Sequence, residues 1–265
     1  MKKWFRKRVG YLFGRKKYQK LFSKLFEVAL KGLNYGTGDD FRHSGELHVL
    51  KYLQTKWHRG EDTVIFDVGA NNGSYGIEAA KIFNDVKVWI YAFEPSAETF
   101  QALVHNTGEI STIIPVNVAL GSRSGQASLY SNSNFSGLAS LHDRRLAHFG
   151  MDLPDQEIIS IQTVDEFCKH RNIENIFFIK LDVEGHEYAV LQGAKELIER
   201  NKIQFIQFEF GGCNIDSRVF FQDFFYFLSP KYKIFRVLKD GLYPINEYSE
   251  NLEVFSVTNY FAQLR

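Results

Sequence analysis

From residue 61 onward, short apolar runs alternate with stretches in which apolar residues recur every three or four positions. The runs predict β-strands, and the helical spacing predicts α-helices between them. Such alternation is typical of a mainly parallel sheet covered by helices on both faces. Strands are predicted near 63–68, 87–93, 112–118, 176–182, 203–210, 232–238 and 252–258, and helices near 74–83, 96–107, 186–200 and 217–228.

Residues 119–162 interrupt this alternation. Glycine, serine and asparagine are frequent there, and only Ala127–Tyr130 and Glu157–Ile161 read as short strands. An insertion between the third and fourth main strands should lie above the carboxyl edge of the sheet, where α/β proteins bind ligands. We therefore expect this segment to cover the substrate site.

The first 31 residues are strongly basic, with eleven Lys and Arg against a single acid, although the whole chain has a net charge of only +1. Two interpretations of this segment remain open: a helix lying on an anionic membrane surface, or a helix packing its apolar stripe on the domain. Nucleic acid is disfavoured because the rest of the chain has no matching basic patch. The stripe consists of Tyr18, Leu21, Phe22, Leu25, Phe26 and Ala29, and Trp4, Phe5, Tyr11, Leu12 and Phe13 extend its aromatic and apolar content. We expect a basic helical extension with a lead-in over 1–60 and one domain over 61–265.

The cysteines indicate the compartment. Cys168 and Cys213 are the only two and form no C-x-x-C pair, which disfavours a disulfide scaffold or a zinc site. No apolar run is long enough for a membrane span, and the N-terminus is too charged for the apolar core of a signal peptide. These observations predict a cytoplasmic protein.

The first predicted strand leads into a glycine turn and a helix, an arrangement that holds nucleosides. Dinucleotide sites read G-x-G-x-x-G, but here Asn71 stands where the second glycine would be, and the spacing is Asp67-x-Gly69-x-x-x-Gly73. The Asp67 carboxylate would repel a phosphate and suits a cationic ligand. Glu94, at the end of the next strand, is placed for ribose hydroxyls. S-adenosylmethionine fits this pattern, and a glycine turn without a ligand is the alternative.

The third predicted strand ends in Asn117 and Val118. If the sheet is ordered as expected, Asn117 reaches the edge of an adenine ring and Val118 packs on its face. A polar residue at a strand end is also a common structural feature.

The fourth strand ends in the densest group of titratable residues, with Asp182, Glu184, His186 and Glu187 close to the start of a predicted helix. Methyl transfer to a hydroxyl requires in-line alignment and removal of a proton. His186 and Glu184 are the candidates for the base and for its orienting or substrate-binding partner, whereas Asp182 is expected to hold the donor. In the alternative interpretation, the acids only complement the dipole of the helix.

The same group raises the possibility of a metal. Asp182, Glu184, His186 and Glu209 could surround a hard divalent cation. Their spacing matches no defined metal motif, and His186 lacks the second histidine of H-E-x-x-H. No metal is therefore predicted, and the metal alternative stays open.

Several segments, in consistent order over roughly 60–260, resemble the FkbM family of S-adenosylmethionine-dependent methyltransferases. They are Phe66–Gly73, Phe93–Pro95, Asn117–Leu120, Gly137–Leu141, Thr163–Phe167 and Lys180–Glu187. The resemblance implies a class I methyltransferase (Rossmann-like) fold of seven strands, the last antiparallel, and methylation of a hydroxyl. It places the reaction centre at Asp182, Glu184 and His186. The candidate cofactor contacts are Asp67, Gly69, Ala70, Asn71, Gly73, Glu94, Pro95, Asn117, Val118 and Asp182.

Enzymes of the family that the chain resembles modify sugars, glycolipids, polysaccharides and polyketide-like natural products. We expect an O-methyltransferase acting on a sugar, glycolipid or surface-glycan precursor, because a membrane-facing helix suits such an enzyme. The alternatives are a natural-product O-methyltransferase and a non-catalytic, membrane-recruited module that retains the cofactor fold. Residues Asn34–Glu46 resemble the lead-in of some members, and Glu46 is a possible cofactor contact.

Overall fold

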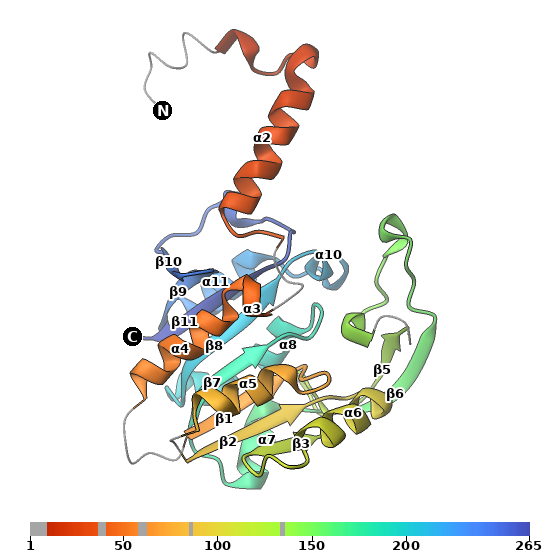
Figure 1. Cartoon of the computed structure of the whole chain (residues 1–265), viewed down its shortest axis with the longest axis vertical. Coiled ribbons are helices and arrows are strands. Elements are labelled where there is room, and N and C mark those ends of the chain that lie inside the picture. The colour runs from red at the N-terminus through yellow and green to blue at the C-terminus, as the bar shows by residue number, and fades with distance from the viewer. Residues whose placement is uncertain (1–9, 37–40, 58–62, 85–86, 133–135) are drawn as a thin grey trace.

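The computed structural model describes residues 10–36, 41–57, 63–84, 87–132 and 136–265 (Figure 1). The lead-in positions 37–40 lie outside these ranges, as do Trp4, Phe5 and the predicted domain boundary at 60. Short 3₁₀ helices occur at Gly10–Leu12, Lys16–Tyr18, Ser136–Leu138, Ala147–Phe149 and Glu250–Leu252.

An eight-stranded sheet forms the centre of the molecule, in the order β10-β9-β11-β8-β7-β1-β2-β3. The strands β3, β2, β1, β7 and β8 pair in parallel, while β11 runs antiparallel to both of its neighbours. The predicted fold class is therefore confirmed, with β10 added as an extra antiparallel edge strand. The strands are β1 (Thr63–Val68), β2 (Val88–Phe93), β3 (Ile113–Val116), β7 (Ile176–Leu181), β8 (Ile203–Phe210), β9 (Tyr232–Leu238), β10 (Gly241–Ile245) and β11 (Thr258–Leu264).

Two predictions for the C-terminal part were wrong. The last strand was expected at 252–258 but occupies Thr258–Leu264, because Tyr260, Phe261 and Ala262 are the residues that become fully buried. The apolar residues before it pack as an irregular, half-buried segment. The edge strand β10 was not predicted, because it contains Pro244 and proline is tolerated in sheets only at edges, strand ends or bulges.

Helices cover both faces of the sheet, and each face has its own apolar core (Figure 1). One core joins the sheet to α7, α8 and α11, and the other joins it to α4, α5 and α6. The predicted helix at 186–200 is two helices, since Gly193 passes so close to the Gly121 carbonyl that a Cβ atom would lie 2.0 Å from its oxygen. The helices of the domain are α3 (Phe41–Ser44), α4 (Glu46–Lys56), α5 (Ser74–Ile82), α6 (Ala97–Thr107), α7 (Val164–Arg171), α8 (Glu187–Gln192), α9 (Lys195–Glu199), α10 (Cys213–Ser217) and α11 (Phe221–Leu228).

The insertion forms a second, three-stranded sheet in the order β4-β6-β5. Its strands are β4 (Ala119–Leu120), β5 (Gly125–Ser131) and β6 (Asp155–Gln162), which contain both predicted strand pieces. β5 and β6 pair antiparallel over seven residue pairs. The chain between them returns to the carboxyl edge of the main sheet, because Ser140 Oγ donates to the Glu184 carbonyl at 2.8 Å.

Helix α2 (Gln19–Gly32) projects away from the domain, and none of its residues is buried (Figure 1). Leu21, Leu25, Phe26 and Val28 are each at least half exposed. The interpretation in which this apolar stripe packs on the domain is therefore wrong for the described residues. No helix in the described part of the chain is both long and apolar enough to cross a membrane.

Candidate active site

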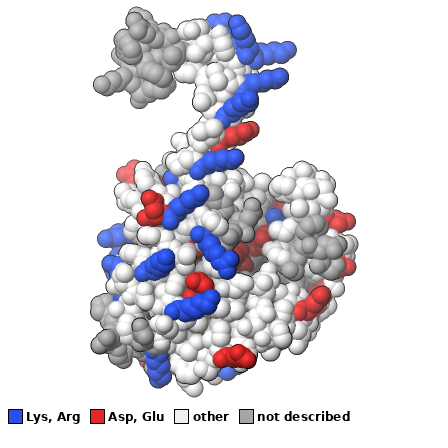
Figure 2. All heavy atoms as spheres, viewed as in Figure 1, with Lys and Arg blue, Asp and Glu red and all other residues white. Residues whose placement is uncertain are grey.

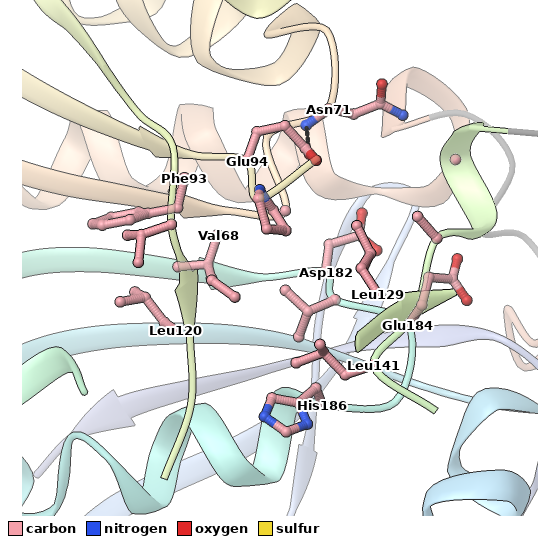
Figure 3. Close-up of a pocket in the computed structure, with 17 residues that line it drawn as sticks. Val68, Asn71, Phe93, Glu94, Leu120, Leu129, Leu141, Asp182, Glu184 and His186 are labelled. Atoms are coloured by element: carbon pink, nitrogen blue, oxygen red, sulfur yellow. Dashed lines mark hydrogen bonds between the residues drawn. The ribbon is translucent and has the colours of Figure 1, made fainter. Parts of the chain in front are cut away.

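A cavity of about 110 Å³, partly open to solvent, lies at the carboxyl ends of β1, β2 and β7 (Figure 3). Leu129, Ala139 and Leu141 of the insertion close one side, as the sequence predicted. Phe93, Val118 and Leu120 add further apolar wall, so the cavity has an apolar part and an acidic part.

The structure brings most of the predicted site residues to this cavity. Those that line it are Gly69, Asn71, Glu94, Pro95, Val118, Asp182, Glu184 and His186. Those that do not are Asp67, Ala70, Gly73 and Asn117.

Glu94 is held firmly at the edge of the cavity. Its Oε2 atom accepts a hydrogen bond from the Asn71 amide at 3.0 Å (Figure 3). Its Oε1 atom accepts one from the Ser96 amide at 3.0 Å. Burial raises the pKa of Glu94 to about 7. A carboxylate has about four lone-pair positions, so two remain for hydroxyl groups of a ligand.

Asn117 does not point into the cavity. Its amide nitrogen donates to the carbonyl oxygens of Glu94 and Pro95 at 2.9 and 3.0 Å. Its side chain thus braces the end of β2, while its neighbour Val118 reaches the cavity wall. Asn117 supports the Glu94 position rather than lining the cavity itself.

Asp67 lies beneath the glycine turn and is fully buried. Its oxygens accept no well-formed hydrogen bond from the residues that the structure describes, although the nearby Gly76 amide lowers the pKa of its carboxyl. Burial is the largest influence and raises the pKa of Asp67 to about 6. The strand alternation explains this placement, because Asp67 shares its face of β1 with the core residue Ile65.

The turn after β1 touches the end of β7. A Cβ atom on Gly69 would lie 1.8 Å from the carbonyl oxygen of Asp182, so only glycine fits there. Gly69 also has a φ of 82°, in the region that favours glycine. The two loops that carry the cavity's polar residues are thus in direct backbone contact.

The acids after β7 have distinct partners. Lys180 Nζ donates to Asp182 Oδ2 at 2.9 Å, and Arg144 Nη1 donates to Glu184 Oε2. Burial raises the pKa of Glu184, and Arg144 counteracts this effect. Glu184 has a φ of 50°, a strained backbone conformation of the kind that collects at functional sites.

Two further buried acids, Glu187 and Glu209, lie near Asp182. Glu187 is fully buried and accepts the amides of Val183 and Gly185 at 3.0 and 3.1 Å, which fixes the loop between β7 and α8. Burial raises the pKa of Glu187 to about 7. Glu209, near the end of β8, is 6% exposed, and burial together with the Asp182 and Glu184 charges raises its pKa well above the ordinary value.

His186 does not join the acids. Its Nδ1 atom lies 3.4 Å from Nε2 of His142. The His186 side chain lies at the opposite end of the cavity from Glu94 (Figure 3). Burial, followed by the nearby His142, lowers the pKa of His186 to about 4, so its ring is neutral at pH 7. His186 and Glu184 were the candidates for the base and for its orienting or substrate-binding partner; in the described contacts Glu184 pairs with Arg144 and not with His186.

Arg144 and His142 were not assigned to the site from the sequence. Both come from the insertion, 40 and 44 positions before the residues they contact. The sequence signal was weak: the pair Arg144–Arg145 stands in a segment otherwise rich in small and polar residues. No local spacing links such a pair to the β7 loop.

The cavity fits S-adenosylmethionine by its donor and acceptor groups. Glu94 keeps two free lone-pair positions for ribose hydroxyls, and Phe93, Val118 and Leu120 offer apolar surface for a purine ring. Asp182 and Glu184 give the other end a negative charge, which suits a sulfonium and an ammonium group.

The chain is similar to known methyltransferases. The sequence model described as "Methyltransferase FkbM domain" matches residues 67–233. The chain is 29% identical over 158 residues to a hexuronic acid methyltransferase, AglP, of Haloferax volcanii, and 26% identical over 158 residues to a 2-O-methyltransferase, NoeI, of Sinorhizobium fredii. These matches cover 58% and 56% of this chain, but only 59% and 63% of the relatives. A solved FkbM methyltransferase from Methylobacillus flagellatus aligns with a TM-score of 0.46 at 16% identity, over 88% of this chain and 58% of its own.

Proposed function

Since the chain belongs to the FkbM methyltransferase family, we propose that it transfers a methyl group from S-adenosylmethionine to a hydroxyl group of a sugar. The observation that carries the proposal is the single cavity that joins Glu94 to Asp182 and Glu184. A nucleoside-binding carboxylate at one end and an acidic cluster at the other suit a cationic donor and an alcohol acceptor in one space.

The donor would be held by residues that line the cavity. Glu94 would bind the ribose hydroxyls, Val118 and Leu120 would flank the purine, and Asp182 would face the cationic end. When bound, the donor supplies a methyl group on a positively charged sulfur. Asn71 and Ser96 keep the Glu94 carboxylate in place through their amides.

The acceptor hydroxyl must lose a proton as the new carbon–oxygen bond forms and the carbon–sulfur bond breaks. His186 and Glu184, two residues apart after β7, are the residues proposed for this task. His186 is neutral, so it has a free lone pair, although its lowered pKa makes it a weak base. Glu184 is the stronger base because burial raises its pKa. Arg144 would fix the Glu184 carboxylate while one of its oxygens faces the acceptor.

The acceptor class is proposed from the curated relatives. One is named for hexuronic acid methylation and the other for 2-O-methylation. This chain spans about three fifths of the length of each relative, so their acceptors are adopted here as a proposal only.

We further propose that α2 lies on an anionic membrane surface. Its exposed stripe of Leu21, Leu25 and Phe26 has no partner on the described domain. Lys20, Lys24 and Lys31 project from the same helix, and Figure 2 shows basic side chains along its length. An apolar stripe beside lysines is the composition of interfacial helices, and anionic lipids complement the positive charge.

The test is incubation of the full chain with isotopically labelled S-adenosylmethionine and a set of acceptors. Label is expected in glycans that contain hexuronic acid and in cell-envelope glycan extracts, at a hydroxyl oxygen. The Glu94→Gln variant, with weakened donor binding, is the matched control. Label in polyketide-like acceptors without label in any sugar would overturn the acceptor class. No binding of the donor by calorimetry would overturn the proposed activity.

A further inference from the structure

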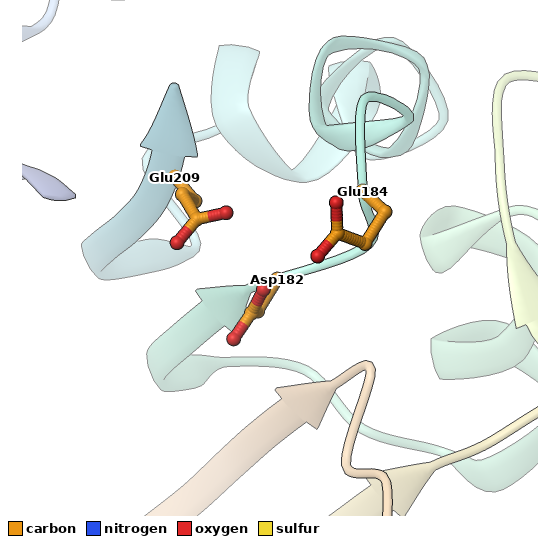
Figure 4. A group of neighbouring side chains, drawn as sticks. All are labelled: Asp182, Glu184 and Glu209. Carbon is orange, nitrogen blue, oxygen red and sulfur yellow. The ribbon is translucent and has the colours of Figure 1, made fainter. Parts of the chain in front are cut away.

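Three carboxylates meet at the carboxyl ends of β7 and β8. Asp182 follows β7, Glu184 lies two residues later in the loop, and Glu209 is the penultimate residue of β8. One oxygen of each lies within 4.8 Å of one oxygen of the other two. Figure 4 shows the three side chains pointing into a common space between the strands.

Glu209 distinguishes this group from an ordinary acidic surface. It is 6% exposed, yet it accepts no hydrogen bond and forms no ion pair with any residue that the structure describes. Asp182 and Glu184, in contrast, have Lys180 and Arg144 as partners. A buried carboxylate without a partner is costly, so a cationic ligand that contacts Glu209 would offset the desolvation of its carboxylate.

The local charges are also unbalanced. The carboxylates that influence one another here outnumber the basic side chains placed against them. The acids are Glu46, Asp67, Asp182, Glu184, Glu187 and Glu209, and the basic residues are Lys180 and Arg144. Like charges held close together in a poorly solvated space repel one another strongly. A bound cation would offset this repulsion.

We propose that Asp182, Glu184 and Glu209 bind a hard divalent cation, Mg²⁺, Mn²⁺ or Ca²⁺. Carboxylate oxygens are the ligands these ions prefer, and the group holds no cysteine or histidine that would favour zinc. Neighbouring ligands lie roughly 3.0 Å apart on Mg²⁺ and roughly 3.4 Å apart on Ca²⁺, from bond lengths of about 2.1 and 2.4 Å. Since the three oxygens lie within 4.8 Å of one another, each would need to move by up to about 1 Å to bind one ion.

The position of the cation suggests its use, a step that rests on the proposed function. Asp182 and Glu184 line the cavity, so the coordination positions that the three acids leave open face the acceptor. A cation there would bind two neighbouring acceptor oxygens, such as a hydroxyl beside a carboxylate or a second hydroxyl. It would also lower the pKa of the hydroxyl, which reduces the need for a strong base.

The experiment measures cation binding to the full chain without donor or acceptor. Protein freed of metal with a chelator is titrated with Mn²⁺, and free Mn²⁺ is followed by electron paramagnetic resonance; Mg²⁺ and Ca²⁺ are tested as competitors. One site per chain is expected, together with a rise in the melting temperature on cation binding. Glu209→Gln is expected to weaken binding at least tenfold and to abolish the rise.

The matched control is Glu46→Gln. Glu46 is also buried and acts on Glu209 electrostatically, but Ser44 and Gln207 already hydrogen-bond to its oxygens. The Glu46→Gln variant loses the same charge as Glu209→Gln but keeps all three proposed ligands. Its affinity for Mn²⁺ is therefore expected to stay within about threefold of the wild type. Glu209→Gln should melt no lower than the metal-free wild type, since it loses an unpartnered buried acid, and this separates lost binding from lost folding.

The site would be disproved by an absence of Mn²⁺ binding at millimolar concentration, by equal binding in Glu209→Gln, or by an equal loss in Glu46→Gln. The two proposals fail separately. Cation binding by a protein that methylates no sugar would contradict only the proposed function, whereas sugar methylation by a chain that binds no cation would contradict only the cation site.

Discussion

Arg144 Nη1 donates to the carboxylate of Glu184, and this ion pair joins the insertion to the end of β7. Both side chains are largely shielded, with 8% and 17% of their surface exposed. The pair therefore fixes the acidic end of the cavity and attaches the small sheet to the large one. Its strength decides how firmly the insertion closes over the site.

Replacing Arg144 with glutamine is expected to lower the free energy of unfolding by about 3 kcal/mol, because Glu184 is left buried without its cation. Urea denaturation monitors this loss. The neighbouring Arg145 is exposed, and Arg145→Gln should change stability by less than about 0.5 kcal/mol. Arg144→Gln should also tighten Mn²⁺ binding, since the variant lacks the positive charge that competes with the cation for Glu184. Equal stability of the two variants would show that the ion pair does not hold the insertion.

Asp67 should destabilise the protein at neutral pH. Burial raises its pKa from 3.8 to about 6, so the folded state holds this proton more tightly than the unfolded state. The stability that this proton contributes is complete below about pH 3.8 and is lost as the pH rises through 6. Asp67→Asn has no carboxyl group to ionise, so it should not lose this stability as the pH rises. The shift in the pKa of Asp67 corresponds to up to about 3 kcal/mol in the free energy of unfolding. Between pH 4 and pH 8, the melting temperature of the variant should rise relative to that of the wild type. A constant difference between the two melting temperatures over this range would contradict the prediction.

Glu94→Gln is expected to weaken binding of S-adenosylmethionine by about ten- to a hundredfold, because a hydrogen bond to a charged group contributes roughly 1.5–3 kcal/mol. Isothermal titration calorimetry gives the dissociation constant directly. Glu98, exposed in the first turn of α6, supplies the control, and Glu98→Gln should bind the donor like the wild type. Unchanged affinity in Glu94→Gln would place the ribose elsewhere.

His186→Gln separates a role in proton transfer from a role in binding. If His186 accepts the hydroxyl proton, turnover should fall by about 10²- to 10⁴-fold while donor affinity changes less than about twofold. The control is His105→Gln, since His105 is exposed on α6. Turnover within about threefold of the wild type would leave Glu184 as the proposed base.

Membrane binding by α2 can be tested with vesicles that contain anionic lipid. Leu25→Glu places a charge in the apolar stripe and should reduce co-sedimentation at least tenfold, because burial of a leucine side chain contributes roughly 2 kcal/mol. Ser23→Glu adds the same charge outside the apolar stripe and should reduce co-sedimentation less than Leu25→Glu does. Binding should weaken as salt increases. Equal effects of the two variants, or no binding of the wild type at low salt, would contradict membrane contact.

The sequence predicted the parallel part of the sheet well, since β1, β7 and β8 are short, predominantly apolar segments that local patterns identify as strands. It failed where tertiary contacts decide. The last strand lies six residues later than expected, and β10 contains a proline that local patterns reject. In the described part of the chain, the position of β11 depends on which residues become buried when the strand packs into the sheet.

The same distinction applies to the site. Glu94 and Asp182 follow strands directly and Glu184 lies two residues after Asp182, so strand order brings all three to the cavity. Arg144 and His142 reach it through the path of an irregular insertion, which no spacing rule encodes. Asp67 was assigned to the ligand although its strand alternation, shared with Ile65, turns it toward the core.

The contact between Gly69 and the Asp182 carbonyl has a kinetic consequence. Because the loops after β1 and β7 touch through their backbones, any side chain at position 69 would displace the backbone of Asp182. Under the proposed function, such a substitution should move Asp182 away from the donor and lower turnover, although Gly69 itself takes no part in the reaction.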